Sequence, residues 1–322
     1  MKLTQLKYLK AIVDNDLNIS LASQELHTSQ PGVSKQIGLL ESELGLEIFE
    51  RKGRNLSSIT DVGQKIMQEV NQMLDVEKKI KAIARDYVDP ESGCMNIYTT
   101  NTIARFILPK TISYFVEKYP TIPLHVGAAH PTENGMISKR GSSDFSIVAH
   151  EVEHHVGLVI LPAYEWSLSL IVPADHPLCE GELTLQRIAR YPLISYDEGS
   201  SGRAVQDIAF GKVGIKPNYF MTVMDTDVIK KYVSMNLGVG IIATIAAKSI
   251  CDDEIVSIPL AKLIDNGKAW LCFGRNVYLQ NHMYDFIEMF SPHLTKNTME
   301  TVMKLTNQEI DNLSATFSLP VY

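Results

Sequence analysis

Hydroxyl-rich turns stand at two places where the sequence changes from a strand pattern to a helix pattern. The first covers residues 98–102, and the second, much later in the chain, covers residues 198–203. Backbone N–H groups are free in the first turn of a helix and the helix dipole there favours negative charge, so both turns can bind an anion across a cleft between two subdomains. The alternatives are that Thr100 or Thr102 only caps a helix, and that the second turn is a flexible surface loop.

Four polar residues share the start of a helical pattern. They are Ser29, Gln30, Ser34 and Lys35. Gln and Lys can reach the base edges of DNA, while Ser can bond a base or a phosphate. Around them, apolar-periodic stretches at 19–26 and 33–44 flank a polar break at 27–30, which is typical of a helix-turn-helix whose second helix lies in the major groove. An ordinary helical hairpin is the alternative.

Cationic side chains follow this motif at Arg51, Lys52 and Arg54. The alternating pattern of residues 48–56 turns at Gly53 and predicts a β-hairpin wing with its cationic tip near DNA phosphates. The first 60 residues carry seven cationic and seven anionic side chains, so the rest of the chain holds the whole net charge of −7. Because a neutral head makes few phosphate contacts, we expect that two copies are needed for useful affinity.

Two further helices are predicted to position this head. A helix at residues 3–12 supplies its core. Thr60 and Asp61 suit the start of a second helix, which continues to residue 88. Within it, apolar residues recur in alternating steps of four and three. The seam comprises Ile66, Val70, Met73, Ile80, Ala84 and Tyr87, interrupted once by Glu77. This spacing favours pairing with a second subunit over packing on the helix's own domain.

Residues 89–93 break the helix and indicate a hinge, after which strand and helix patterns alternate. Strands are predicted at 95–100, 123–129, 144–150, 168–174, 191–197, 220–225, 239–244 and 270–275. Helices are predicted at 104–119, 135–141, 183–191, 227–238, 245–250 and 282–294. Such alternation implies open sheets with crossover helices, which bind ligands at the carboxyl ends of strands.

Size and composition exclude several classes of protein. The 322 residues suit two or three domains, and a hydrophobic content of 45% indicates globular sequence. The four cysteines are scattered without a CxxC pair, which favours reduced thiols over disulfides or zinc sites. No apolar stretch is as long as a membrane span, and charges interrupt the N-terminal segment where a signal peptide would be apolar. We therefore expect a soluble cytoplasmic protein.

Three further patterns give no support to catalysis or metal binding. Residues 238–243 match the dinucleotide pattern GxGxxA, but a helix precedes them and a strand follows, which is the wrong order. His150, His154 and His155 have metal-like spacing but lie among acidic residues in an expected exposed turn, without a second ligand group. A GxSxG motif is absent, as is a Cys/His grouping. We expect neither an enzyme nor a metal or other cofactor.

The head resembles that of the LysR-type transcriptional regulators. The resemblance rests on Ala22, Leu26, Ser29-Gln30-Pro31, Ser34, Ile37, Leu40-Glu41, Leu44-Gly45, Leu46, Phe49, Arg51 and Thr60. The remainder resembles that family's effector-binding half, a two-subdomain fold similar to type 2 periplasmic binding proteins. Within the family, the chain is similar to the CysB/Cbl-like regulators of sulfur assimilation. The supporting segments are MKLTQLKYLK, HTSQPGVSKQI, YTTNTIARFILP, LPAYEW, DHPL, DTDVIKKYVSMNLGVG and MYDFIEMFSPHLT.

The resemblance also implies a binding site, because in CysB-like proteins Thr, Gln and Trp side chains hold sulfate or a similar anion in the cleft. The matching positions here are Thr100, Thr102, Trp166 and Ser201, where Ser201 replaces a Thr but keeps the hydroxyl. Ile103 stands where a Gln is usual, and Ala149 where a Thr is usual. Each lost donor costs about 0.5–1.5 kcal/mol of binding. The resemblance therefore implies weaker binding or a less polar ligand, such as an acylated serine or an organosulfur compound.

These inferences predict an α/β protein with an N-terminal winged helix-turn-helix. The predicted parts are a DNA-binding domain at 1–60, a linker and dimerisation helix at 61–89, and an effector-binding domain at 93–322. The last has two Rossmann-like subdomains, 93–162 with 268–322, and 163–267. We expect a dimeric or tetrameric regulator that binds double-stranded DNA and a small anionic effector, and no membrane. The alternative is a stand-alone solute-binding or metabolite-processing protein with an incidental helical head.

Overall fold

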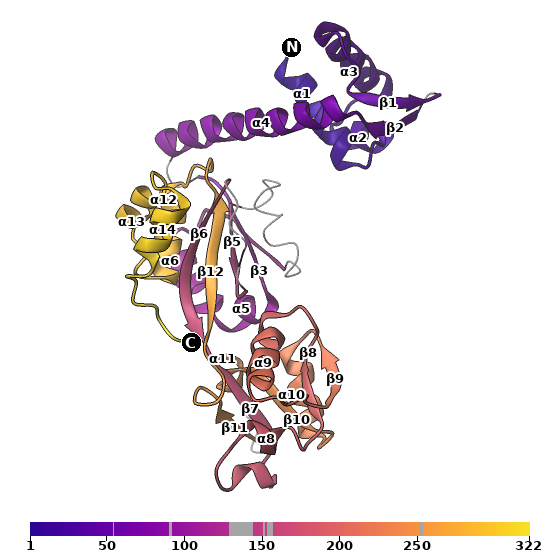
Figure 1. Ribbon diagram of the computed structural model, residues 1–322. Helices are drawn as coiled ribbons and strands as arrows, with labels where there is room; N and C mark the ends of the chain where they lie inside the picture. The colour runs from indigo at the N-terminus through magenta and orange to yellow at the C-terminus, as the bar shows by residue number, and fades with distance from the viewer. Residues whose placement is uncertain (54, 90–91, 129–143, 151, 153–156, 251–253) are drawn as a thin grey trace. The chain divides into compact units, whose positions relative to one another are not determined.

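The chain forms two compact units, Met1–Ala84 and Arg85–Tyr322, drawn in Figure 1. The computed structural model describes every residue except 54, 90–91, 129–143, 151, 153–156 and 251–253. The predicted helix at 135–141 and part of the predicted hinge therefore lie outside the described residues. The boundary between the units falls inside the long helix α4, and each unit has its own apolar core.

The first unit is the predicted winged helix-turn-helix. Its elements are α1 (Leu3–Asp14), α2 (Ile19–Glu25), α3 (Gln30–Leu44), the antiparallel strands β1 (Phe49–Lys52) and β2 (Asn55–Ile59), and the start of α4 (Asp61–Val88). Capping fixes where the helices begin, because Asn18 accepts bonds from the first turn of α2 and Ser29 accepts from Gly32 N at 3.3 Å. Gly45 ends α3 at a φ of 69°, in the left-handed region that favours glycine.

The long helix α4 divides into a buried half and an exposed half. Val70 and Leu74 are buried in the core of the head, although the predicted seam counted Val70 among the residues that face a partner. Glu77 bonds Lys7 of α1 and Lys81, at 2.7 Å each, so it faces the helix's own domain. Besides Val62 and Val88 near its ends, the helix exposes five apolar residues at alternating steps of three and four: Met73, Val76, Ile80, Ile83 and Tyr87. The predicted seam is therefore wrong near its start, where Val70 faces the core of the head and not a partner subunit.

The second unit holds two five-stranded sheets. The first has the order β4-β3-β5-β12-β6, from β3 (Met95–Thr99), β4 (Leu124–Ala128), β5 (Phe145–Val148), β6 (Leu158–Trp166) and β12 (Gly267–Gly274). The second has the order β11-β7-β10-β8-β9, from β7 (Leu168–Pro173), β8 (Leu193–Tyr196), β9 (Tyr219–Val223), β10 (Val239–Ala243) and β11 (Ile255–Pro259). Parallel pairing of β3 with β4 and β5, and of β8 with β9 and β10, confirms the predicted α/β class.

Helices cover both sheets. Those of the first are α5 (Asn101–Phe106), α6 (Leu108–Lys118), α12 (Asn281–Phe290), α13 (Lys296–Val302) and α14 (Asn307–Ser314). Those of the second are η1 (Pro177–Cys179), α8 (Leu185–Ile188), α9 (Ser201–Lys212), α10 (Thr226–Ser234) and α11 (Thr244–Ala247). Figure 1 shows α6, α12, α13 and α14 together on one side of the first sheet. The chain passes between the sheets at Ser167 and again over residues 260–266, which places Trp166 and Gly267 at the crossing.

Several predicted elements need correction, and proline accounts for two of them. The single helix expected at 104–119 is split at Ile107, since Pro109 in the first turn of α6 cannot continue the hydrogen bonds of α5. Strand β6 was not predicted because Pro162 interrupts its pattern; Pro162 lies at an irregularity in the pairing with β12. Strand β11 was also missed, and the helix expected at 183–191 is the single turn α8.

Candidate functional site

The exposed start of α3 carries the residues predicted to contact DNA. Gln30 and Lys35 are exposed, and neither side chain bonds any of the described residues. Ser34 is half-buried beside them. Ser29 is exposed, but its hydroxyl caps the helix through Gly32 N. Two side chains are thus free to read a groove, while Ser29 also fixes the start of the helix that presents them.

In the wing, the predicted phosphate-binding cations differ in their surroundings. Arg51 Nη2 lies 2.8 Å from Glu41 Oε2, and the same carboxylate accepts bonds from Ile48 N and Phe49 N at 2.9 and 3.2 Å. Lys52 is exposed at the end of β1, and Arg54 lies outside the described residues. Arg51 therefore joins the wing to α3 with part of its guanidinium and presents only the remainder to a ligand.

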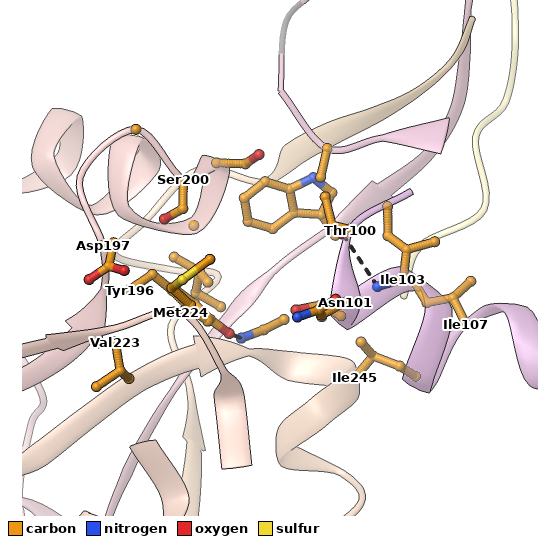
Figure 2. Close-up of a pocket in the computed structure, with 18 of the residues that line it drawn as sticks. Thr100, Asn101, Ile103, Ile107, Tyr196, Asp197, Ser200, Val223, Met224 and Ile245 are labelled. Atoms are coloured by element: carbon orange, nitrogen blue, oxygen red, sulfur yellow. Dashed lines mark hydrogen bonds between the residues drawn. The ribbon is translucent and has the colours of Figure 1, made fainter. Parts of the chain in front are cut away.

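A cavity of about 350 Å³ opens between the two sheets, where β3, β8 and β10 end. It is lined by Thr100, Asn101, Thr102, Ile103, Ile107, Ala149, Tyr164, Trp166, Leu168, Tyr196, Asp197, Glu198, Gly199, Ser200, Ser201, Gly202, Val223, Met224, Ala243 and Ile245. Figure 2 shows Thr100, Asn101 and Ile103 on one wall and Tyr196, Asp197 and Ser200 on the facing wall. The position agrees with the rule that open α/β sheets bind ligands at the carboxyl ends of strands.

Both hydroxyl-rich turns line this cavity, and in each turn one hydroxyl also caps the helix that follows. Thr100 Oγ1 accepts a bond from Ile103 N at 3.4 Å, so Thr100 caps α5 while it lines the cavity (Figure 2). Thr102 lines the cavity as well. In the second turn, Ser200 caps α9 through Arg203 N at 3.3 Å, and Ser201 begins that helix at the cavity wall. Residues 201–203 are thus the first turn of α9, and residues 198–200 form the turn that precedes it.

Tyr196 is the functional candidate that sequence reasoning missed. Burial raises the pKa of its phenol, and the hydroxyl bonds Thr226 Oγ1 at 3.0 Å and accepts from Ala243 N at 3.2 Å. Its ring lies so close to Gly202 that a Cβ there would come within 2.7 Å. The start of α9 therefore requires a small residue at position 202. Tyr196 itself could have been recognised in the sequence from its place at the end of a predicted strand.

Trp166 has an unsatisfied polar group in the cavity wall. Only 6% of the residue is exposed, and its indole N–H has no hydrogen-bond partner among the described residues. The six-membered part of the ring packs on Gly267, its neighbour across strands β6 and β12, where a Cβ would come within 2.2 Å. A buried N–H without a partner costs free energy, which an acceptor atom on a ligand can recover.

Among the described residues that line the cavity there is no Lys, Arg or His. Arg203 follows the second turn, but its guanidinium bonds Asp207 Oδ1 at 2.9 Å and lies 3.4 Å from the centre of the Tyr219 ring. Its Nη1 also donates to the Tyr196 carbonyl, at 3.4 Å. These contacts place Arg203 behind the wall. A negative charge in the cavity would therefore rely on backbone N–H groups and neutral donors.

The histidines noted in the sequence do not come together as a described metal site. Burial lowers the pKa of His150, and His154 and His155 lie outside the described residues. Elsewhere in the described part of the chain, three or more His, Cys, Asp or Glu side chains nowhere gather as metal ligands would. Among the described helices, none combines the length and the apolar character needed to cross a membrane.

Comparison with known proteins decides the family. Residues 3–64 match the bacterial regulatory helix-turn-helix of the lysR family, and residues 89–295 match the LysR substrate binding domain. The chain is a LysR-type transcriptional regulator. A transcriptional regulator named CysB from Haemophilus influenzae is 42% identical over 95% of this chain and 94% of its own length. The regulator Cbl of Escherichia coli is 33% identical over 97% and 99%.

The solved structures agree with this assignment. The cofactor-binding domain of the Cbl transcriptional regulator is 32% identical, with a TM-score of 0.63, over 66% of this chain and 95% of that domain. The predicted family, the winged head and the two-sheet effector half are thus confirmed. LysR-type regulators act by binding DNA rather than by catalysis, so the stand-alone solute-binding or metabolite-processing alternative is wrong.

Proposed function

We propose that this LysR-type regulator controls genes of sulfur assimilation or sulfur-compound metabolism in response to a small anionic effector in the inter-sheet cavity. The observation that carries the proposal is the exposed face of the first two turns of α3, where Gln30 and Lys35 have no partner among the described residues. Similarity to CysB and Cbl supports the sulfur-related role. Sulfate, acetylserine and organosulfur compounds are the candidate effectors.

On DNA, Gln30 and Lys35 are assigned to base edges in the major groove, and Ser29 and Ser34 to bases or phosphates. Lys52, with Arg54 outside the described residues and the free part of Arg51, is assigned to phosphates flanking the groove. Because the first 60 residues have balanced charges, one head supplies little electrostatic affinity. Two heads bound to spaced half-sites supply more electrostatic affinity than one head does.

Pairing of the heads is assigned to the exposed apolar seam of α4. Met73, Val76, Ile80 and Ile83 are each more than a third exposed and recur at coiled-coil spacing. An apolar row on a long helix is stabilised when a second helix covers it, and a two-fold pair matches two half-sites of DNA. The regulator is accordingly proposed to act as a dimer or tetramer.

The effector is assigned to Thr100, Thr102, Trp166 and Ser201, which line one cavity. The unsatisfied indole N–H of Trp166 and the first turn of α9 supply donors for a negatively charged group. An effector can change the arrangement of subunits only by binding one arrangement more tightly than another. Contacts from both walls provide such a difference, because they form fully only at one separation of the two sheets.

A gel-shift experiment at stated salt tests the regulator proposal. Wild type should bind promoter fragments that contain paired half-sites more tightly than random DNA, and Lys35→Ala should reduce this preference. Lys110→Ala is a matched control, since Lys110 is an exposed lysine on α6 in the other unit. If wild type and Lys35→Ala bind both kinds of DNA equally poorly, the proposed DNA contacts are refuted.

A further inference from the structure

We propose that the cavity binds an amphipathic monoanion, that is, one carboxylate or sulfonate group on an apolar body, in preference to inorganic sulfate. This inference rests on the proposed function and narrows the class of effector. Four properties of the cavity lead to it: the character of its walls, the sign of their charges, its unsatisfied donors and its size.

The walls are mainly apolar. Aliphatic and sulfur-containing side chains reach the cavity from both sheets and their helices, and they include Ile103, Ile107, Ala149, Leu168, Met224 and Ile245. Figure 2 shows Ile103, Ile107 and Ile245 together on the wall that faces Ser200 and Asp197. Ile103 and Ala149 occupy the positions where the family resemblance implies hydrogen-bond donors. A wall of this kind stabilises hydrocarbon and leaves the oxygens of an inorganic oxyanion unpaired.

The charges on the walls oppose a doubly charged ligand. The described lining contains the carboxylates of Asp197 and Glu198 and no Lys, Arg or His. Glu198 is 89% exposed, so solvent screens much of its charge, whereas Asp197 is half-buried. A dianion transferred into this cavity would lose its hydration without gaining a counter-charge, which is strongly unfavourable. The described walls therefore favour a ligand with one negative charge over a ligand with two.

The cavity offers several donors that have no partner among the described residues, and they suit a single head group. Helix α9 has twelve residues, and the backbone N–H groups of Ser201 and Gly202 in its first turn have no partner among the described residues. The Ser201 hydroxyl and the unsatisfied indole N–H of Trp166 also belong to the lining. By contrast, the Thr100 hydroxyl on the facing wall already caps α5. The head group therefore belongs at α9, and the apolar body extends toward Ile103 and Ile245.

The size of the cavity agrees with this arrangement. The cavity has a volume of about 350 Å³. Because a water molecule occupies about 30 Å³ in the liquid, this volume corresponds to on the order of ten waters. A lone five-atom oxyanion would leave most of the apolar wall in contact with water. A head group that carries a chain of several carbon atoms fills the space and covers that wall.

Isothermal titration calorimetry on the full-length protein tests the proposal with four probes at one pH and ionic strength. They are pentanesulfonate, hexanoate, sodium sulfate and pentanol. At least one of the two acids should bind about tenfold or more tightly than sulfate, because their chains bury apolar surface. Pentanol, which lacks the charge, should bind more weakly than the better acid. The first two probes also distinguish a sulfonate head from a carboxylate head.

A double variant, Ile103→Gln with Ala149→Thr, restores the two donors and makes the test specific to this cavity. It should bind the preferred acid about tenfold or more weakly and bind sulfate more tightly than wild type does. Ile208→Gln is the control, because Ile208 is 59% exposed on α9 and is not in the lining. Ala149→Thr alone serves as the second test if the double variant does not fold.

Several outcomes overturn the inference: sulfate or pentanol binding as tightly as the better of the two acids, neither acid binding, or the variants leaving the order of affinities unchanged. Fluorescence anisotropy on promoter DNA, with the same protein preparations, separates this failure from failure of the proposed function. A protein that binds DNA but prefers sulfate contradicts only the amphipathic ligand. A protein that binds the acids but ignores DNA contradicts the regulator.

Discussion

Arg51 in the wing and Glu41 in the recognition helix form an ion pair, Nη2 to Oε2 at 2.8 Å, that connects two parts of the DNA-binding head. The Glu41 side chain is only 10% exposed, and its other oxygen accepts bonds from Ile48 N and Phe49 N. One carboxylate thus holds the start of β1 and its cation against α3. The angle between wing and helix depends on this residue.

Replacing Glu41 should destabilise the head. In Glu41→Ala the two backbone N–H groups lose their acceptor and Arg51 loses its partner, so we expect a loss of about 3 kcal/mol in the free energy of unfolding. Urea denaturation measures it. Glu47→Ala removes an exposed carboxylate nearby and should stay within about 0.5 kcal/mol of wild type. Equal stability of the two variants would show that the Glu41 contacts contribute little.

A charge placed on the exposed seam of α4 should dissociate the subunits. Ile80 is 62% exposed, so Ile80→Glu leaves the core of its own head intact but puts a carboxylate where the seam would pair. Sedimentation velocity should show a smaller species that retains its helix content. Asn71→Glu introduces the same charge at an exposed position outside the seam and should keep the wild-type mass. Unchanged assembly of Ile80→Glu would refute pairing through this seam.

Gly267 should be indispensable for the shape of the ligand cavity. A Cβ at this position would come within 2.2 Å of the Trp166 ring, so Gly267→Ala must displace the indole. We expect a lower melting temperature and a loss of effector affinity of about tenfold or more. Gly211→Ala on α9 is the control, because nothing lies within 4 Å of its added Cβ and alanine should stabilise the helix by about 0.5–1 kcal/mol. Normal ligand affinity in Gly267→Ala would contradict this role.

The stability of the protein should fall as the pH drops below the ordinary pKa of histidine, 6.5, partly because of His282. Burial among Phe115 and Tyr119 lowers the pKa of His282, and the nearby carboxylates of Asp86 and Asp285 oppose this only partly. The unfolded chain therefore takes up a proton that the folded chain does not, and protonation favours unfolding in this pH window.

The difference in unfolding free energy between pH 7.5 and pH 5.5 measures this effect. Wild type should lose more stability than His282→Gln over that interval, whatever the variant's stability at pH 7.5. Burial also lowers the pKa of His150 and His176, so some pH dependence should remain in the variant. An identical change in both proteins would show that His282 does not contribute.

Local signals in the sequence predicted the elements that local physics determines. The helix-turn-helix, its wing and the 28-residue helix α4 follow from periodicity, capping and turn residues. The position of Thr100 at a strand end likewise predicted that it would line a cleft. The family resemblance, rather than spacing, supplied Trp166.

The features of the fold and the site that were not predicted depend on contacts between distant segments, which periodicity does not encode. Glu41 counts as one more surface anion in the sequence, yet tertiary packing buries it against Arg51. The seam of α4 was placed wrongly because Val70 is apolar on either interpretation, and only the folded head shows that it faces inward. Trp166 packs on Gly267 of a neighbouring strand that lies far along the chain, so no local pattern signals this contact.

Selection of binding sites from sheared genomic DNA by the full-length protein tests whether this regulator recognises paired half-sites near sulfur genes. We expect recovery of sites with two half-sites, separated by about one helical turn or a multiple of it, beside genes that process sulfur compounds. Gln30→Ala with Lys35→Ala should recover none of these sites, and the preferred effector should change the occupancy found with wild type. Recovery of no paired sites by wild type, or of the same sites by the double variant, would refute the proposed DNA recognition.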